Sequence, residues 1–191
     1  MFPKWRRRKK EENPNPSVQT LVTVPRVSKG EVLIDFYPVS PPFAYAAIVR
    51  RGPRGRYEYK VLEPPLTAED KRAIEEIKSL VSRTVRVDLK TLREKSPEQV
   101  LEEEVKRVVK KYRVKVKREA WDKILYYVKR DMLGYGKIDV LMKDEHIEDI
   151  SCDGVGVPVF VWHSRYESMP TNIVFNAVSY THLTLPTILL V

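Results

Sequence analysis

The residues whose types could do chemistry are concentrated between positions 144 and 163. Four carboxylates lie within six residues: Asp144, Glu145, Glu148 and Asp149. Such carboxylates could act as an acid–base pair, as in glycoside hydrolysis, but a short acidic run between two elements is more typical of a solvated connector. His146 lies among these acids and is predicted to be a surface residue, while His163 is predicted to end a strand.

Other catalytic and ligand-binding arrangements find little support in the same stretch. Cys152 is the single cysteine, and His146 and His163 are too far apart in the chain for metal-ligand spacing. Gly154-Val155-Gly156 precedes a predicted strand rather than a helix, so it indicates a turn and not a dinucleotide fingerprint. No nucleophile lies on an elbow motif, and the chain contains no G-x-x-x-x-G-K-[ST] sequence. We therefore expect no catalytic, cofactor-binding or metal-binding residues in this chain.

Three predicted strands position this stretch. The first contains Ile147 and Ile150 and is closed by Asp153-Gly154, the second covers residues 157–162, and the third covers residues 171–175. They are expected to form a meander. A helix precedes them and is predicted to end at the glycines 134 and 136.

The region 29–65 is predicted to be rich in β-structure. Strands are expected at residues 31–37, 43–50 and 57–62, and the alternation of Tyr57, Tyr59 and Val61 with charged residues indicates one buried face. The arginine–glycine loop at residues 51–56 could bind phosphate, although a charged hairpin tip is the more common explanation.

The region 66–136 is predicted to be a bundle of three helices. The first begins with Thr67 as N-cap and Asp70 at the capping-box position, and the second with Ser96-Pro97-Glu98-Gln99. The third covers about residues 118–133. Each helix carries an apolar stripe at helical spacing, so the three stripes are expected to pack together.

The two ends of the chain differ from the rest. Residues 1–28 are predicted to be a disordered basic tail because prolines interrupt it. This tail is either solvated or a contact for an anionic membrane or platform protein, made by the cluster Trp5, Arg6, Arg7, Arg8, Lys9 and Lys10. Residues 177–191 read as the translation of a transposon-based sequencing adapter, the alternative being a true apolar strand. On the adapter interpretation, the chain is a truncated piece of a longer protein.

Composition and charge limit the class of protein to which the chain can belong. With 42% hydrophobic and 32% charged residues, the 191-residue chain is expected to be globular and soluble. A single cysteine suits a reducing cytoplasm, and neither a signal peptide nor a membrane-spanning run is apparent. Of the net charge of +9, residues 1–60 carry +8, so the basic surface is expected in the N-terminal third.

Two runs, residues 138–144 and 147–154, resemble the opening of the N-terminal domain of type II/IV secretion ATPases. They read IDVLMKD and IEDISCDG, where the family phrase is D-P-L-hydrophobic-x-D-x-x-I-E-D-I-x-x-D/N-G. Val140 replaces the usual proline. The runs around Tyr37-Pro38-Val39, Pro41-Pro42 and Glu63-Pro64-Pro65 are also similar to the archaeal GspE-like branch, so the resemblance covers roughly residues 30 to 176.

The resemblance implies an α+β fold: a β-rich segment, a three-helix bundle, and at 137–176 the first strands of an incomplete mixed α/β domain, PAS-like in this family. It also implies a hexameric motor of secretion, pilus or archaellum assembly, in which ATP and Mg²⁺ bind to a missing P-loop part. The N-terminal region would dock onto an inner-membrane platform protein at the cytoplasmic surface. Some members offer an arginine to a neighbouring nucleotide site, and Arg165 is the candidate here by its place in a turn.

Two other functions stay open from the sequence. Three helices followed by a hairpin can imitate a winged-helix nucleic-acid-binding module, although nearly all the net charge lies outside residues 61–191, so no nucleic acid is expected. A purely structural adaptor is the third possibility.

Overall fold

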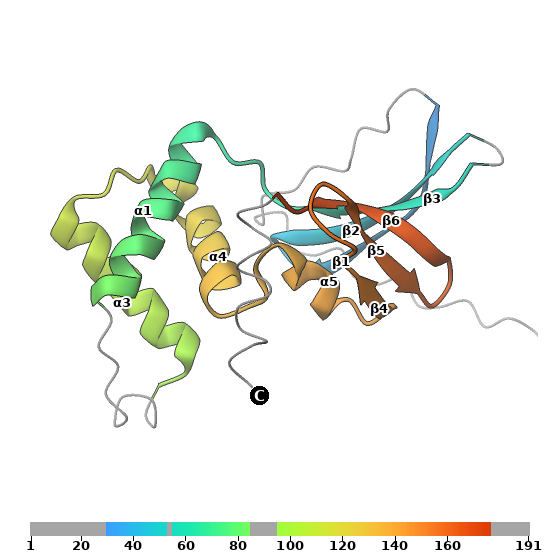
Figure 1. The fold of residues 1–191 in the computed structure, drawn as a ribbon. Helices are drawn as coiled ribbons and strands as arrows, with labels where there is room; N and C mark the ends of the chain where they lie inside the picture. Colours follow the sequence, from blue (N-terminus) through green and yellow to red (C-terminus); the bar gives the residue numbers. More distant parts are fainter. Residues whose placement is uncertain (1–29, 53–54, 85–94, 177–191) are drawn as a thin grey trace, which may run out of the picture.

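The computed structural model describes residues 30–52, 55–84 and 95–176. Both chain ends, with the predicted contact cluster Trp5 and Arg6 to Lys10 and the tail 177–191, lie outside the described residues. The fold is α+β, with strands before and after a group of helices (Figure 1). The strands are β1 (Glu31–Ser40), β2 (Ala44–Arg51), β3 (Tyr57–Leu62), β4 (Ile147–Ser151), β5 (Pro158–His163) and β6 (Glu167–Val174). The helices are α1 (Ala68–Thr84), α3 (Pro97–Tyr112), α4 (Trp121–Met132) and α5 (Asp139–Lys143), with 3₁₀ turns η1 (Arg118–Ala120) and η2 (Gly136–Ile138).

The six strands form one sheet in the order β1-β2-β3-β6-β5-β4. Two antiparallel meanders meet at β3 and β6, which run parallel with Tyr59 opposite Thr171. Beside this pair the Asn172 side chain replaces a backbone partner. Its Oδ1 accepts from the Val61 N–H at 2.8 Å, and its Nδ2 donates to the Val61 carbonyl at 3.0 Å. The two β segments that the sequence presents separately therefore share one sheet.

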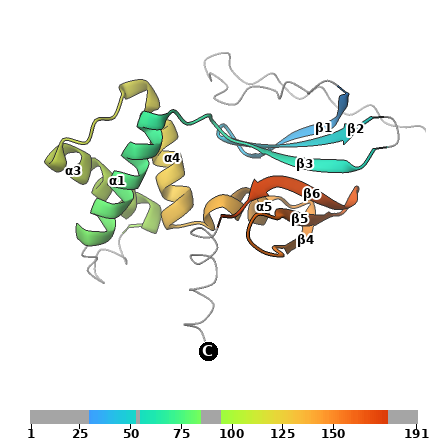
Figure 2. The ribbon, with the colours of Figure 1, turned by 45° about the horizontal axis from the view of Figure 1, so that its top comes forward.

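The sheet is bent, so that β1–β3 lie over β4–β6 (Figure 2). Side chains from both halves fill the space between them, joined by Val140 and Leu141 of α5. The predicted alternation in β3 is confirmed, since Tyr59 and Val61 are buried and Tyr57 is half-buried. Besides Val140 and Leu141, the most deeply buried members of this core are Ala44, Ala46, Ile48, Tyr59, Val159 and Met169.

The predicted meander of three C-terminal strands is confirmed, with differences in its bounds. β5 is shifted by one residue, to 158–163, and β6 begins at Glu167 rather than at residue 171 and ends at Val174 rather than at residue 175. Pro170 lies inside β6 opposite Phe160.

The predicted helix starts are confirmed in the bundle. Asp70 N–H donates to Thr67 Oγ1 at 3.2 Å, and Thr67 N–H donates to the Asp70 carboxylate at 2.9 Å. Ser96 and Gln99 form the second box at 3.3 and 3.1 Å. Each box satisfies N–H groups that a helix start leaves free. The apolar stripes pack together as predicted, with the core residues Ala73, Ile74, Ile77, Val81, Leu101, Val105, Val108, Ile124, Tyr127 and Val128.

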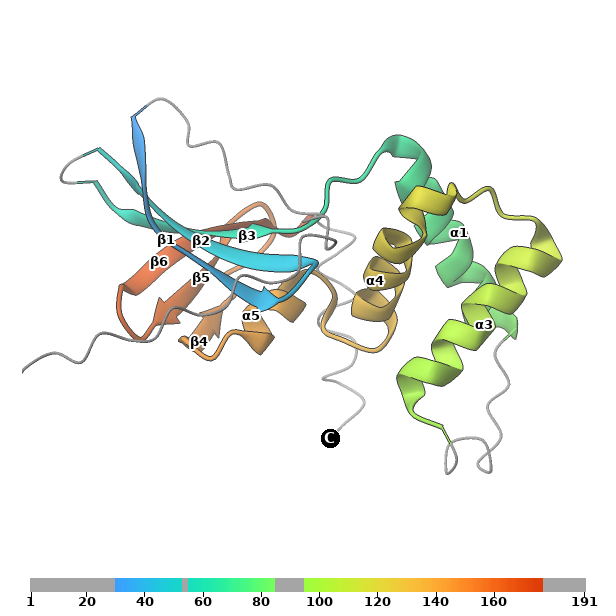
Figure 3. The same ribbon diagram turned by 180° about the vertical axis from the view of Figure 1, so that it is seen from behind.

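The bundle lies at one end of the sheet, with α4 nearest and α3 farthest from the strands (Figures 1 and 3). One joint connects them. Glu63, just after β3, accepts from Arg130 Nη1 at 2.7 and 2.9 Å and from the Tyr126 hydroxyl at 2.7 Å, and the Tyr127 hydroxyl donates to the Pro64 carbonyl at 2.8 Å. Among the described residues, no helix is long and apolar enough to cross a membrane.

The five-residue helix α5 was not predicted, because it is too short to show helical periodicity. Its first residue, Asp139, is buried; it accepts from the Tyr135 N–H at 3.0 Å and from Lys143 Nζ at 2.7 Å. A Cβ at Gly134 would lie 2.2 Å from the Asp139 carboxylate, so this position requires glycine. The glycine end of α4 and the start of α5 are thus one tightly packed turn.

Candidate functional site

Asp144 is the centre of the most connected polar cluster. It lies between α5 and β4 and is 6% exposed. Its Oδ2 accepts from the Tyr37 hydroxyl at 2.7 Å and the Tyr59 hydroxyl at 2.6 Å, and its Oδ1 accepts from the His146 N–H at 2.9 Å. One carboxylate therefore connects β1, β3 and the start of β4.

The prediction of a solvated acidic connector is wrong for Asp144, which is buried, and right for Glu145, which is exposed. Glu148 and Asp149 are exposed as predicted, but they belong to strand β4 and not to a connector. Asp144 is buried because the bend in the sheet brings two tyrosine hydroxyls to it from strands 107 and 85 residues away in the chain. A buried carboxylate is tolerated where hydrogen-bond donors satisfy it. Because these donors lie on distant strands, no local sequence pattern predicts that Asp144 is buried.

Burial, and then hydrogen bonding to Asp144, raise the pKa of Tyr37 and of Tyr59 well above the usual range. Both hydroxyls therefore stay protonated as donors. Their protons point at Asp144, so the Tyr37 oxygen is left to accept a hydrogen bond from another group. The cluster is organised to hold strands together rather than to release a proton.

His163, at the end of β5, supplies the donor to Tyr37. Its Nε2 lies 3.1 Å from the Tyr37 hydroxyl, and its Nδ1 accepts from the Arg165 N–H at 3.1 Å. These two partners fix the neutral tautomer with the proton on Nε2. Burial lowers the pKa of His163, against the opposing effect of Asp144, so the neutral form is favoured at neutral pH. The prediction that His163 ends a strand is confirmed.

His146 and His163, distant in sequence, have ring centroids 5.5 Å apart. His146 is half-buried, and its Nε2 lies 3.0 Å from Arg165 Nη2. The guanidinium has no acceptor atom, so Arg165 donates this hydrogen bond and His146 accepts it. The other guanidinium nitrogen, Nη1, lies 3.6 Å from the Asp35 carboxylate. Arg165, the candidate nucleotide-contacting arginine, is thus held in place by neighbours in its own chain, and its side chain stays 56% exposed.

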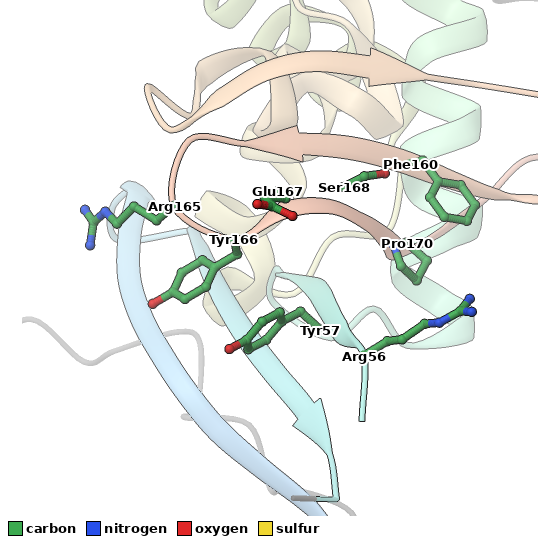
Figure 4. A pocket seen from close by; sticks show the side chains of 8 residues that line it. All are labelled: Arg56, Tyr57, Phe160, Arg165, Tyr166, Glu167, Ser168 and Pro170. Carbon is green, nitrogen blue, oxygen red and sulfur yellow. The ribbon is translucent and has the colours of Figure 1, made fainter. Parts of the chain in front are cut away.

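A groove of about 690 Å³ lies beside this cluster, at the ends of β3 and β6 where their pairing stops. Its centre is formed by Tyr57 and Tyr166, whose rings are 5.2 Å apart, and Tyr166 donates to Asp35 at 3.2 Å. Figure 4 shows the two tyrosines side by side and the Arg165 side chain directed outward. The remaining lining residues are Arg56, Phe160, Glu167, Ser168 and Pro170. Tyrosine and arginine are enriched where proteins bind one another.

Other residues named from the sequence have structural places. Gly154 and Gly156 have φ of +140° and +78° in the turn between β4 and β5, and the Gly156 N–H donates to the Phe175 carbonyl, so the strand-connecting turn is confirmed. Cys152 is a half-buried free thiol. Arg51 pairs with Glu31 and Glu58, as a charged hairpin end would. Within the described part of the chain, no group of three or more His, Cys, Asp and Glu is placed to hold a metal ion.

Apart from the alternation that turns one face of β3 inward, no sequence pattern predicts the Tyr37–Asp144–His163 cluster. Asp35, Tyr57 and Tyr166 were likewise missed as site residues, because their partners lie on strands far away in the chain. An alternation pattern tells which face a residue occupies, and not which residue of a distant strand it meets.

No protein-family profile matches the chain. Over 118 residues it is 37% identical to MJ1288, an uncharacterized protein of Methanocaldococcus jannaschii. The match covers 62% of this chain and 47% of MJ1288, so the chain spans about half the length of that relative.

Proposed function

We propose that this chain is the front part of a hexameric ATPase that powers type II secretion, type IV pilus assembly or archaellum assembly. One observation carries the proposal: the run that resembles these motors, residues 138–154, contains the residues that determine the local fold. Asp139 holds the turn after α4, and Asp144 joins β1, β3 and β4. Exposed positions tolerate many residues, whereas a buried carboxylate requires its donors. Agreement at such positions therefore supports kinship more strongly than agreement on the surface.

On this proposal, the bent sheet with α5 is the PAS-like N-terminal domain of the motor, and the helical bundle is an attachment inserted between β3 and α5. The archaeal relative is compatible with this view, since less than half of its length lies within the match. ATP and Mg²⁺ would bind to a P-loop domain that follows residue 176. The described region would act at the cytoplasmic face of the membrane.

The groove around Tyr57 and Tyr166 is the surface that we assign to docking on the platform protein of the inner membrane. It combines the half-buried rings of Tyr57 and Tyr166 with the exposed residues Arg56 and Arg165, which favours a partner segment that offers carboxylates and apolar side chains. The Arg165 side chain is already oriented by His146 and Asp35. An arginine held in this way loses less conformational freedom when a partner binds.

The gene itself provides the first test. Sequencing the locus from the source organism should show a reading frame that continues past Asn176 and reaches a G-x-x-x-x-G-K-[ST] motif. The complete protein should form hexamers and hydrolyse ATP with Mg²⁺, and the 191-residue chain alone should show no turnover. A native stop codon directly after position 191, or metal-dependent hydrolysis by the pure chain, would refute the proposal.

The docking role can be tested in the complete protein. Binding to the cytoplasmic part of the platform protein, measured by titration calorimetry, should weaken at least about tenfold in Arg56→Glu, since a rim charge is reversed. Arg83→Glu, an equal charge change on the exposed face of α1, is the matched control and should bind as the natural protein does. Equal weakening in both variants would show that the groove is not the docking surface.

A further inference from the structure

The run KRVVKKYRVKVKR, residues 106–118, contains eight Lys or Arg residues and no Asp or Glu. It forms the second half of α3 and the connector to η1. All eight cationic residues are exposed. This concentration of charge lies in the bundle, outside the N-terminal third to which the sequence analysis assigned the basic surface.

Three of the eight cations are neutralised within the bundle. Lys106 pairs with Glu102, Arg107 with Glu104, and Lys117 with Glu69. The other five form no ion pair with any described residue, and with Tyr112 they make up what we call the basic surface: Lys110, Lys111, Arg113, Lys115 and Arg118.

Local structure turns these cations outward. α3 ends at Tyr112, Arg113 adopts the left-handed conformation with φ 56°, and the chain then runs without regular structure to Lys117. Val114 is buried and Val116 half-buried against the bundle core, so Lys115 between them points to solvent. The bundle core therefore fixes the side of the connector on which the charges lie.

The helix dipole accounts for only part of this arrangement. Lys110 and Lys111 lie in the last turn of α3, where cations are favoured by the negative helix end. Arg113, Lys115 and Arg118 lie beyond the helix, and the dipole effect falls off within its last turn. These three residues need another explanation.

Tyr112 indicates the kind of partner. It lies between the cations in the sequence and is 43% exposed, with Lys111 Nζ 5.3 Å from the centre of its ring. Tyrosine is enriched at the headgroup level of membranes, where its ring and its hydroxyl both find suitable surroundings. Clustered Lys and Arg around such a residue are attracted to the negative surface of anionic bilayers.

We propose that the basic surface binds a membrane that contains anionic lipids. It covers the last turn of α3, the helix farthest from the strands, and the connector that leads to η1, so a membrane bound there leaves the sheet and the groove accessible (Figures 1 and 3). The assignment rests on residues 110–118 alone and stands whether or not the chain belongs to a secretion motor.

The test uses the full 191-residue chain and two triple variants of equal charge. Arg113→Gln/Lys115→Gln/Arg118→Gln changes the basic surface, and Lys71→Gln/Arg72→Gln/Arg83→Gln changes exposed cations of α1. Partition onto phosphatidylcholine vesicles that contain one third phosphatidylglycerol is measured by co-sedimentation at physiological salt, with pure phosphatidylcholine vesicles as the blank. Equal melting temperatures verify that both variants are folded.

The basic-surface variant should partition at least about tenfold more weakly, because each residue near the bilayer contributes about fivefold to the partition coefficient. The α1 variant should lose less than about threefold, as expected for a general charge effect at this ionic strength. Equal losses in both variants, or no binding of the natural chain to anionic vesicles, would overturn the proposal. So would binding to a short DNA duplex that depends on the basic surface while vesicle binding does not, since the partner would then be nucleic acid.

Discussion

The helical bundle and the bent sheet are stabilised in different ways. In the bundle, apolar stripes from α1, α3 and α4 meet, and polar side chains serve at helix starts or in pairs on the surface. In the sheet, a buried carboxylate, two tyrosines and a histidine connect segments that lie 85 to 126 residues apart in the chain. A surface pair contributes little because water screens it, whereas a buried acceptor that loses its donors is strongly unfavourable.

This difference predicts where substitutions reduce stability most. Removing one of the exposed, separate ion pairs of the bundle, such as Lys95–Glu103 or Lys117–Glu69, should have a small effect that adds to the others. Substitutions in the sheet cluster should have large effects, because Asp144, Tyr37 and His163 share partners. The following variants are ordered by the size of the expected effect.

Asp144→Ala should have the largest effect. It leaves the hydroxyls of Tyr37 and Tyr59 without their acceptor, and Tyr59 is fully buried. We expect the free energy of unfolding to fall by about 3–5 kcal/mol, the range for a broken buried hydrogen-bond network. Urea unfolding of the 191-residue chain at pH 7, followed by circular dichroism, measures this.

Asp149→Ala is the matched control for Asp144→Ala. It removes an exposed carboxylate from the same acidic stretch, and should change the free energy of unfolding by less than about 0.5 kcal/mol. If both substitutions had similar effects, Asp144 would not be the centre of the sheet cluster, and the contrast between the two regions would not hold.

Glu63→Ala tests the joint between the regions. It leaves the Arg130 guanidinium, whose side chain is 10% exposed, with Asp131 as its remaining acidic partner. We expect a loss of about 2 kcal/mol, less than for a fully buried pair because Asp131 compensates in part. The circular dichroism signal of the helices should then show the bundle unfolding at a lower urea concentration than the sheet, whose unfolding is followed by the near-ultraviolet signal of its tyrosines.

The exposed ion pair Lys95–Glu103 provides the control for the joint. Glu103→Ala removes the partner of Lys95, and both side chains of that pair are largely exposed, so a change below about 0.5 kcal/mol is expected. If the helix and sheet signals of Glu63→Ala changed together, at the urea midpoint of the natural chain, the Arg130 pair would not couple the two regions.

The bundle could be predicted from sequence because its signals are local. Ser96, Pro97 and Gln99 specify a helix start within four residues, and the structure forms the predicted capping box. Strands could be found from their alternation, although β6 extends beyond its prediction. The pairing of β3 with β6 could not be predicted, since parallel neighbours are set by packing across the whole chain and not by a turn.

The site was harder to predict than the fold. Asp144 was assigned to a solvated connector because its exposed neighbours Glu145 and Glu148 dominate the local composition. Its burial depends on Tyr37 and Tyr59, which reach it only after the sheet has bent. A polar cluster built from distant strands has no spacing rule, whereas a capping box does.

Ser96→Ala should have a moderate effect that is confined to the bundle. The substitution removes the side chain that accepts from the Gln99 N–H at 3.3 Å, and loss of such a cap lowers stability by about 1 kcal/mol. Ser82→Ala, the same change on the exposed face of α1, should slightly raise the free energy of unfolding, because alanine has the higher helix propensity. Thermal unfolding of both variants under the same conditions shows whether stability falls in Ser96→Ala and rises in Ser82→Ala.

Glu102→Gln should have the smallest effect, and its dependence on pH identifies its origin. Hydrogen bonds from Lys106 and from Lys129 lower the pKa of Glu102 to about 2. Because the pKa in the folded state lies below the ordinary value of 4.5, the contribution of Glu102 is complete above pH 4.5 and is lost as the pH falls towards 2. At pH 7 the variant should therefore be less stable by about 0.5–1 kcal/mol, the upper range for partly exposed pairs.

Near pH 2 the Glu102→Gln variant and the natural chain should unfold at nearly the same denaturant concentration, because the carboxyl group is then about half protonated in the folded state and almost fully protonated in the unfolded state, so little of its contribution remains. Glu76→Gln, on the exposed face of α1, controls for the general loss of one negative charge and should stay within about 0.5 kcal/mol at either pH. A deficit of Glu102→Gln that persists unchanged at pH 2 would show that Glu102 acts by packing rather than by charge. The bundle would then depend on close side-chain contacts at its surface, as the sheet does in its interior.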